Sequence, residues 1–255
     1  MSEALRAGRL VGRRALVTGA GGGLCAEVVR AFAAEGADVA VLGRRREPLE
    51  RIAAEVEAAG RRSVVLPCDV ADAEAAAAAV DAAAAQLGGL DVVVNGAAID
   101  TGWAPAGEMS VSIWRDTIAI NLNGTYFVCR AALPHMLGAG GGSIVNISSV
   151  AGNKAWALDA AYNASKAGVE ILTRTIAVEY AVQGIRANCV APGVIDAGLT
   201  DTVKEAGERE ELVAMHPMDR MGTVAEFAEA VVWIASDAAS FTTGSTLRVD
   251  GGFLS

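Results

Sequence analysis

The chain has 255 residues, of which 53% are hydrophobic, and a formal net charge of −9. This length suits one α/β domain with a large core, and the apolar content excludes a disordered chain. The acidic charge argues against a nucleic-acid partner. The sequence has no apolar run of the roughly 18 residues that a transmembrane helix needs, and its first residues lack the apolar core of a signal peptide. We therefore expect a cytoplasmic protein away from membranes.

Short apolar segments alternate with Ala-rich helical segments through the first half of the chain. We expect strands at 14–19, 37–43, 63–70 and 90–96, and helices at 24–36, 47–60 and 72–88. Glycine ends the first two helices, and Asp72 is a typical N-cap for the third. The strands are continuous runs of Val, Leu and Ile, which is typical of parallel strands covered on both faces.

The same alternation continues in the second half. We expect helices at 111–137, 160–183 and 224–236, and strands at 143–149, 185–193 and 245–252. The polar stretch 196–218 has no strand character and is interpreted as a substrate lid, with a solvated helical excursion as the alternative. Residues 1–255 therefore predict a single α/β domain, a doubly wound parallel sheet (Rossmann fold) with helices on both faces.

The cysteines and histidines give no sign of a disulfide framework or a metal site. The four cysteines are widely spread and form no CxxC pair, which favours free thiols in a reducing compartment. His135 and His216 have no ligand spacing to each other or to a cysteine, so we expect no metal.

A glycine-rich turn, "TGAGGGL", follows the first strand and opens the first helix. Glycines allow the backbone to approach a pyrophosphate, and the helix N-terminus favours its negative charge. The turn therefore predicts a dinucleotide site, with a tight turn that binds nothing as the alternative.

The second strand ends in "LGRRR" instead of the acidic residue that binds the NAD ribose. An arginine fork matches a 2′-phosphate, so the sequence favours NADP(H), with Arg44 as the principal contact and Arg45 as a second. A solvated basic turn is the alternative reading.

The segment "YNASK" places Tyr162 and Lys166 four residues apart, on one face of a helix. A neighbouring cation favours the phenolate, so we expect the pKa of Tyr162 to fall from its ordinary value of about 10. Tyr162 could then exchange a proton with a carbonyl or alcohol oxygen. An exposed helical pair is the alternative.

Eight short motifs occur in order along nearly the whole chain: "TGAGGGL", "CDV", "NGAA", "INLNG", "NISSVAG", "YNASKAG", "NCVAPG" and "FTTGSTLRVDGG". On these motifs the chain resembles the short-chain dehydrogenase/reductase family, in its common non-extended branch, and especially ketoreductases of the 3-oxoacyl reductase type.

The resemblance implies a role for each matching residue. Tyr162 would donate and accept the proton, Lys166 would lower its pKa and hold the nicotinamide ribose, and Ser149 would hydrogen-bond the substrate oxygen. Asn121 would anchor a water that continues the proton relay, and Asp69 would accept the adenine amine. The implied cofactor-binding residues are Gly19, Gly21, Gly22, Gly23, Leu24, Arg44, Arg45, Asp69, Val70, Asn95, Gly96, Tyr162, Lys166, Pro192, Gly193 and Val194.

The implied function is an NADP(H)-dependent ketoreductase, a homotetramer that acts on a ketone or secondary alcohol of moderate size. Trp156, Leu158, Val194 and Leu199 are the apolar candidates for its substrate pocket. One alternative is an alcohol dehydrogenase that prefers NAD(H) and works in the oxidative direction. Another is a dinucleotide-binding regulator without turnover.

Three positions depart from the usual family pattern. Cys25 replaces the last glycine of the turn, "NGAA" stands where "NNAG" is commoner, and Ala197 stands where a threonine is common. All three lie on the cofactor side, so they bear on cofactor affinity more than on the chemistry. We expect Cys25 to pack inertly; because a helix N-terminus depresses a thiol pKa, a redox switch is the alternative.

Overall fold

The computed structural model describes residues 8–196 and 206–255, and these form one sheet of seven parallel strands with helices on both faces. The strands are β1 Arg14–Thr18, β2 Asp38–Gly43, β3 Ser63–Pro67, β4 Val92–Asn95, β5 Gly142–Ile147, β6 Ile185–Pro192 and β7 Thr246–Val249. Their order is β3-β2-β1-β4-β5-β6-β7, so the winding direction reverses between β1 and β4. This arrangement confirms the predicted Rossmann-type fold class.

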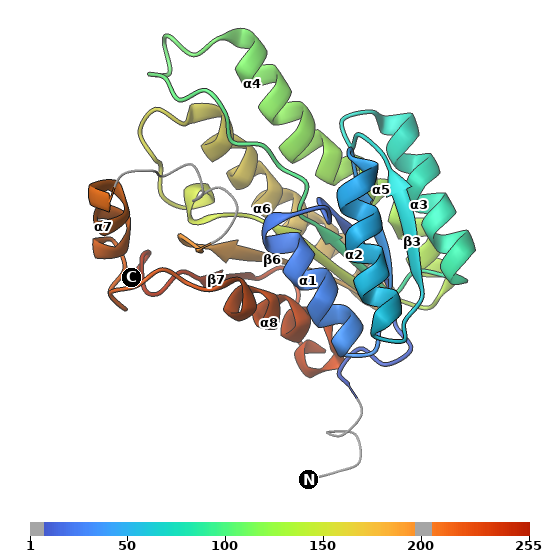
Figure 1. Cartoon of the computed structure of the whole chain (residues 1–255). Coiled ribbons are helices and arrows are strands. Elements are labelled where there is room, and N and C mark those ends of the chain that lie inside the picture. The colour runs from blue at the N-terminus through green and yellow to red at the C-terminus, as the bar shows by residue number, and fades with distance from the viewer. Residues whose placement is uncertain (1–7, 197–205) are drawn as a thin grey trace.

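Two layers of helices cover the sheet (Figure 1). The helices are α1 Gly23–Ala34, α2 Arg46–Ala58, α3 Ala73–Leu87, α4 Val111–Ile118, α5 Gly124–Gly138, α6 Ala160–Tyr180, α7 Ala206–Ala214 and α8 Val224–Ala235. Buried side chains of α1, α2 and α8 pack on one face of the sheet. Those of α3, α5 and α6 pack on the other face.

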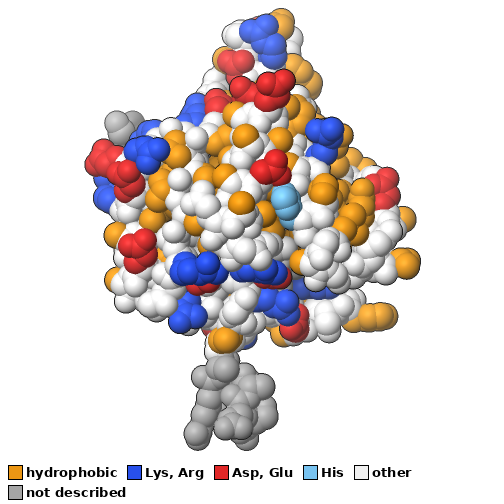
Figure 2. Space-filling model, turned by 90° about the vertical axis from the view of Figure 1, so that its right-hand side faces the viewer, with side chains coloured by type: hydrophobic (Ala, Val, Ile, Leu, Met, Phe, Trp, Pro, Cys, Tyr) orange, Lys and Arg blue, Asp and Glu red, His pale blue; other side chains and the backbone are white. Residues whose placement is uncertain are grey.

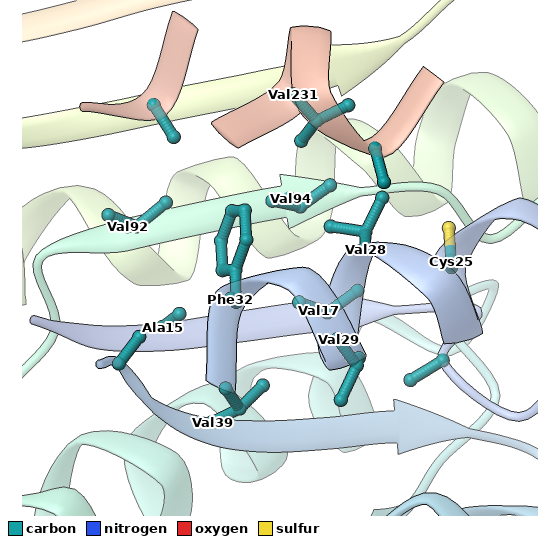
Figure 3. Close-up of a cluster of buried hydrophobic side chains, with 14 of the residues drawn as sticks. Ala15, Val17, Cys25, Val28, Val29, Phe32, Val39, Val92, Val94 and Val231 are labelled. Atoms are coloured by element: carbon teal, nitrogen blue, oxygen red, sulfur yellow. The ribbon is translucent and has the colours of Figure 1, made fainter. Parts of the chain in front are cut away.

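The first core layer lies between α1, α8 and the strands at the winding reversal (Figure 3). Phe32 of α1 is fully buried and lies among Val92, Val94 and other valines of the sheet. Full burial of a phenylalanine contributes about 1.5–3 kcal/mol, so this layer fixes the position of α1. The N-terminus of α1 is thereby held at the carboxyl end of β1.

Two long helices predicted from the sequence contain segments that are not α-helical. The helix expected over 111–137 is α4 and α5 joined by a π-helical turn, Ala119–Asn123. The helix expected over 160–183 is α-helical up to Tyr180, and its last residues, Ala181–Gln183, form a 3-10 turn. Extra residues in a helical turn commonly occur at functional sites, and this π-helical turn carries Asn121.

Only part of the predicted lid can be described. Helix α7 lies within 196–218, whereas residues 197–205, with Ala197 and Leu199, are outside the described part of the chain. On the side of the molecule that Figure 2 shows, Lys and Arg side chains alternate with Asp and Glu. No single-sign field covers that face.

Candidate functional site

The carboxyl ends of the strands open into a cavity of about 970 Å³. Open parallel sheets bind their ligands at this edge, where the strand order reverses. The loops after β1 to β6 all contribute to its wall. Every residue predicted to bind a cofactor lines the cavity except Asn95.

The glycine turn presents free backbone to the cavity. Gly22 is the N-cap of α1 and provides no capping side chain, so the first N–H groups of the helix lack a side-chain partner. A β-carbon on Gly22 or Gly23 would meet nothing within 4 Å. A pyrophosphate can therefore approach the helix N-terminus, and the turn fits the group that it predicts.

The turn after β1 is joined to the loop after β4. The Thr18 hydroxyl accepts hydrogen bonds from the Gly96 and Ala97 amides at 3.0 and 3.1 Å. Gly19 has a φ of 72°, and a β-carbon there would lie 2.9 Å from the Gly96–Ala97 backbone. Glycine is thus required at position 19 for both conformation and space.

Cys25 lies in the first turn of α1 and is buried, with 4% of its surface exposed. Burial raises the pKa of its thiol to about 12, although the charge of Lys166 opposes this shift. The depressed pKa that a redox switch needs is therefore not found. The structure favours the packing role for Cys25.

The arginines after β2 differ in their contacts. Arg44 and Arg45 line the cavity, and neither side chain makes a hydrogen bond or ion pair with any residue in the described ranges. Arg46 instead begins α2 and pairs with Glu50 at 3.4 Å. The first two guanidinium groups are consequently available for an anionic ligand.

Asp69 and Val70 follow β3 and bound the cavity farther along the same edge. The Asp69 carboxylate accepts a hydrogen bond from the Ala71 amide at 3.0 Å. Val70 is buried, and a β-carbon on Gly124 would clash with its side chain, so α5 holds this part of the wall in place.

Ser149, Tyr162 and Lys166 lie together in the cavity, as the sequence predicts. Ser149 follows β5 and its hydroxyl accepts a hydrogen bond from the Ala151 amide at 3.1 Å. Tyr162 and Lys166 come from the first two turns of α6. The Lys166 ammonium lies 5.4 Å from the centre of the Tyr162 ring.

Lys166 is buried, and its ammonium donates a hydrogen bond to the Ile147 carbonyl at 2.9 Å. Burial lowers the pKa of Lys166 to about 8. A nearby carboxylate, Asp100, partly opposes this shift.

The pKa of Tyr162 differs from the sequence expectation. Burial raises it above its ordinary value, and the hydrogen bond with Ser149 offsets only part of the effect. The carboxylates of Asp100 and Asp159 raise it further. The shift is therefore opposite to the one predicted from the neighbouring ammonium, because desolvation and the two carboxylates raise the pKa of Tyr162.

Asp100 and Asp159 were not singled out from the sequence. Both line the cavity near Tyr162, and burial together with the charge of Asp100 raises the pKa of Asp159 to about 6. No local motif contains the two residues, since they lie on separate loops. The Asp159 loop contacts the other loop through the Ala104 amide, which donates to the Leu158 carbonyl at 2.8 Å.

Two predicted site residues have their side chains behind the cavity wall. Asn121 accepts from the Ile99 amide and donates to the Ile99 carbonyl, both at 2.8 Å, and also donates to Ser165 at 3.2 Å. Asn95 donates to the Asn146 side chain at 2.8 Å, and its own oxygen has no partner. Asn121 thus fixes the position of Ile99, which lines the cavity.

Of the apolar residues predicted for the substrate pocket, some line the cavity and others do not. Trp156 and Val194 line the cavity, together with Trp103, which is 69% exposed at its rim. Leu158 does not line it and is itself 48% exposed. Leu158 also has a φ of 68°, an unusual value for a branched residue, in the loop that leads into α6.

A ring cluster beside the cavity also escaped the sequence reading. Trp156 stacks on Phe253 with ring centres 5.6 Å apart. Phe253 also contacts the His216 ring, whose centre lies 5.4 Å from that of Phe253. The C-terminus accordingly ends beside α7 (Figure 1). No spacing in the sequence relates residues 156, 216 and 253.

Within the described ranges, no three His, Cys, Asp or Glu side chains are grouped so as to hold a metal ion. Across residues 8–196 and 206–255, no helix combines the length and apolar character needed to cross a membrane. The four cysteines are free and buried.

Sequence comparisons relate the chain to known proteins. The family model described as enoyl-(acyl carrier protein) reductase matches residues 19–254. The cis-4-hydroxycyclohexanecarboxylate dehydrogenase of Sinomonas cyclohexanicum is 44% identical over 241 residues, or 94% of this chain and 96% of that protein. The cyclohexanol dehydrogenase of Acinetobacter sp. strain SE19 is 36% identical over 253 residues, 99% of each chain.

A solved structure agrees with the sequence matches. Carveol dehydrogenase from Mycobacterium avium, in complex with NAD, has a TM-score of 0.92 and 32% identity. The match covers 97% of this chain and 99% of that chain. The similarity therefore extends over the entire sheet and the cavity at its edge.

Proposed function

Because the chain belongs to the short-chain dehydrogenase/reductase family and is an NAD(P)-dependent oxidoreductase, we propose that it is a ketoreductase that uses NADP(H). Its substrates are ketones and secondary alcohols of moderate size. The observation that carries this proposal is the presence of Ser149, Tyr162 and Lys166 in the cavity that Arg44 also lines. One part of the cavity suits a carbonyl oxygen and another suits a phosphate.

In this function, the substrate oxygen is served by three side chains with different roles, those of Ser149, Tyr162 and Lys166. A bound nicotinamide dinucleotide supplies or accepts the hydride. The Tyr162 hydroxyl donates a proton to the substrate oxygen in reduction and recovers it in oxidation. The Ser149 hydroxyl donates a hydrogen bond to the same oxygen and stabilises its negative charge. The Lys166 ammonium, held by the Ile147 carbonyl, stabilises the phenolate and holds the nicotinamide ribose.

Asn121 takes part from behind the wall. Its side chain holds the backbone of Ile99 through two hydrogen bonds, one accepted from the Ile99 amide and one donated to the Ile99 carbonyl. In the proposal it also anchors the water that returns a proton to Lys166. Asn95, which is turned away from the cavity, acts through the position of the adjoining Gly96.

The cofactor assignment follows the edge of the sheet. In the proposal, the glycine turn (Gly19 and Gly21 to Leu24) would hold the pyrophosphate, Asp69 and Val70 would hold the adenine, and Pro192, Gly193 and Val194 would border the nicotinamide; all of these residues line the cavity. Arg44 and Arg45 would bind the 2′-phosphate, because their guanidinium groups line the cavity and have no protein partner in the described ranges. NAD(H) is the alternative cofactor.

The substrate assignment rests on the apolar wall and on the relatives. Trp156, Val150 and Ile99 line the same cavity as Tyr162, and they favour an aliphatic ring over a charged chain. Two similar proteins are named for cyclohexane alcohols. We infer that a cyclic secondary alcohol or its ketone is the substrate class, and that the protein acts in the cytoplasm as a homotetramer.

A screen of NADPH oxidation with cyclic and open-chain ketones tests the proposal. We expect turnover with cyclohexanone-type substrates, and a loss of at least about a hundredfold in kcat for Tyr162→Phe, since general acid catalysis contributes about 10²–10⁴-fold. The Tyr126→Phe variant is the matched control, because Tyr126 lies exposed on α5 outside the cavity. Equal turnover by Tyr162→Phe would contradict the assignment, and better turnover with NADH would favour the NAD-dependent alternative. Cofactor binding without turnover would favour a regulator.

A further inference from the structure

Gly193 and Val194 follow β6 and line the cavity, and three hydrogen bonds hold their backbone. The Gly193 amide donates to the Val249 carbonyl at 3.0 Å, and the Val194 carbonyl accepts from the Gly222 amide at 3.0 Å. The third contact is the Val194 amide, which donates to Nε2 of His216 at 3.2 Å. His216 is the only one of these three partners that contributes a side chain.

The roles of the two His216 nitrogens follow from their partners. Nδ1 lies 2.8 Å from the Leu212 carbonyl, which can only accept a hydrogen bond, so Nδ1 carries the proton. The Val194 amide can only donate, so Nε2 offers its lone pair. The ring therefore links the end of α7 to the cavity wall through one donor and one acceptor.

The His216 ring is closely packed by its neighbours. His216 is 3% exposed, and a β-carbon on Gly193 would lie 2.9 Å from its Nε2. Its ring also contacts Phe253, which stacks on the cavity-lining Trp156 and lies 4.5 Å from the Lys154 ammonium. His216 thus connects the two walls of the cavity, one through Val194 and the other through Phe253 and Trp156.

We propose that His216 is a positioning residue for the nicotinamide dinucleotide: its ring fixes the Val194 amide, and with it the Pro192–Val194 wall, in the place that cofactor binding requires. The inference rests on the proposed function, in which this wall borders the nicotinamide. His216 does not touch the reacting atoms. It acts through the backbone that lines the cavity.

Two substitutions separate the hydrogen bonds of His216 from its packing. His216→Phe retains an aromatic ring against Phe253 but loses both hydrogen bonds. His216→Gln loses the ring but keeps a donor and an acceptor on one planar group. Direct titration of each purified protein with NADPH and with NADH gives the dissociation constants, and initial rates give KM and kcat.

We expect His216→Phe to weaken binding of both cofactors by about tenfold, because the partly buried Val194 amide loses its partner. Its kcat at saturating cofactor should remain within about twofold, and His216→Gln should bind within about threefold of the parent. Parent-like binding by His216→Phe, or equally weak binding by both variants with unchanged melting temperatures, would overturn the proposal. Because binding is measured without turnover, a parent that binds NADPH but reduces no ketone would overturn only the proposed reaction.

A measurement on the unaltered protein does not depend on the folding of either variant. Hydrogen–deuterium exchange is followed in peptides that contain Val194 and in peptides that span 212–217, with and without NADPH. Since one ring holds both segments, the cofactor should slow exchange in both together. Slower exchange confined to the Val194 peptides would count against His216 as the link.

Discussion

The Cys25 sulfur occupies the space that a β-carbon on Gly96 would need. Cys25 replaces the last glycine of the turn after β1, and Gly96 stands where the family more commonly has asparagine. The two departures from the family pattern are thus complementary: the turn gains a side chain where the loop after β4 has none. This contact lets α1 pack against the loop after β4 without the usual glycine.

The complementarity can be measured with a double-mutant cycle. Gly96→Ala forces a new side chain against Cys25 and should lower the free energy of unfolding by about 1–3 kcal/mol. Cys25→Gly removes buried volume and places glycine in a helix, which should cost about 1–2 kcal/mol. In the double variant the clash is absent, so its loss of unfolding free energy should be smaller than the sum of the two single-variant losses by at least about 0.5 kcal/mol. Urea unfolding of the four proteins measures this coupling, and strictly additive losses would show that the contact is unimportant.

Cofactor preference should depend on Arg44 and Arg45 and not on their neighbour. In the proposed function, Arg44→Ser would remove a charge-assisted contact to the 2′-phosphate, so kcat/KM for NADPH should fall by about 10- to 100-fold while that for NADH changes by less than about threefold. Arg45→Ser should act in the same direction and more weakly. Arg46→Ser is the matched control, because Arg46 pairs with Glu50 and does not line the cavity. Parallel losses with both cofactors would refute the assignment of a phosphate site.

The sequence predicts the features of this protein that depend on local pattern. The strand–glycine–helix order locates the cavity edge, and the spacing of Tyr162 and Lys166 places both on one face of α6. It does not predict the direction of the Tyr162 pKa shift, because burial and the charges of Asp100 and Asp159 arise from loops that meet only in the fold. His216 was missed for the same reason, since its partners are a backbone amide and a ring from distant segments.

The carboxylates around Tyr162 predict a pH effect. Ionised Asp159 raises the pKa of Tyr162, so Asp159→Asn should lower that pKa. Alcohol oxidation needs Tyr162 without its proton, and therefore the acidic limb of kcat/KM should move to lower pH by a few tenths of a unit to about one unit. Asp100→Asn should shift the limb in the same direction. Because the pKa of Tyr162 is raised above its ordinary value of 10, the shift is measured as a higher kcat/KM for oxidation at each pH between about 5 and 10, with Asp116→Asn on exposed α4 as the control. A lower kcat/KM across this range would contradict this electrostatic account.

The buried ammonium of Lys166 should make folding stability depend on pH. Its pKa falls from 10.5 to about 8 on burial, so below pH 8 the folded protein retains a desolvated charge at a cost on the order of 3 kcal/mol. Between pH 8 and 10.5 the folded state releases this proton before the unfolded state does, and the stability of the parent rises. The stability of Lys166→Met relative to the parent should thus be greatest at pH 7 and should decline as pH approaches 10.5. Urea unfolding without cofactor tests this, and a difference independent of pH would contradict it.

The outer face of α6 should form a subunit interface. Ile171 and Val178 are seven residues apart on one helix face and are 57% and 82% exposed, while Trp114 of the adjoining α4 is 44% exposed. Apolar side chains of this size on one surface favour association with a second copy. Light scattering of the parent should give about four times the chain mass of 25.9 kDa, and Ile171→Glu with Val178→Glu should give a smaller species. Val11→Glu, which alters an exposed valine before β1, should leave the mass unchanged. A monomeric parent would refute the tetramer, and a tetramer that survives both α6 charges would place the interface elsewhere.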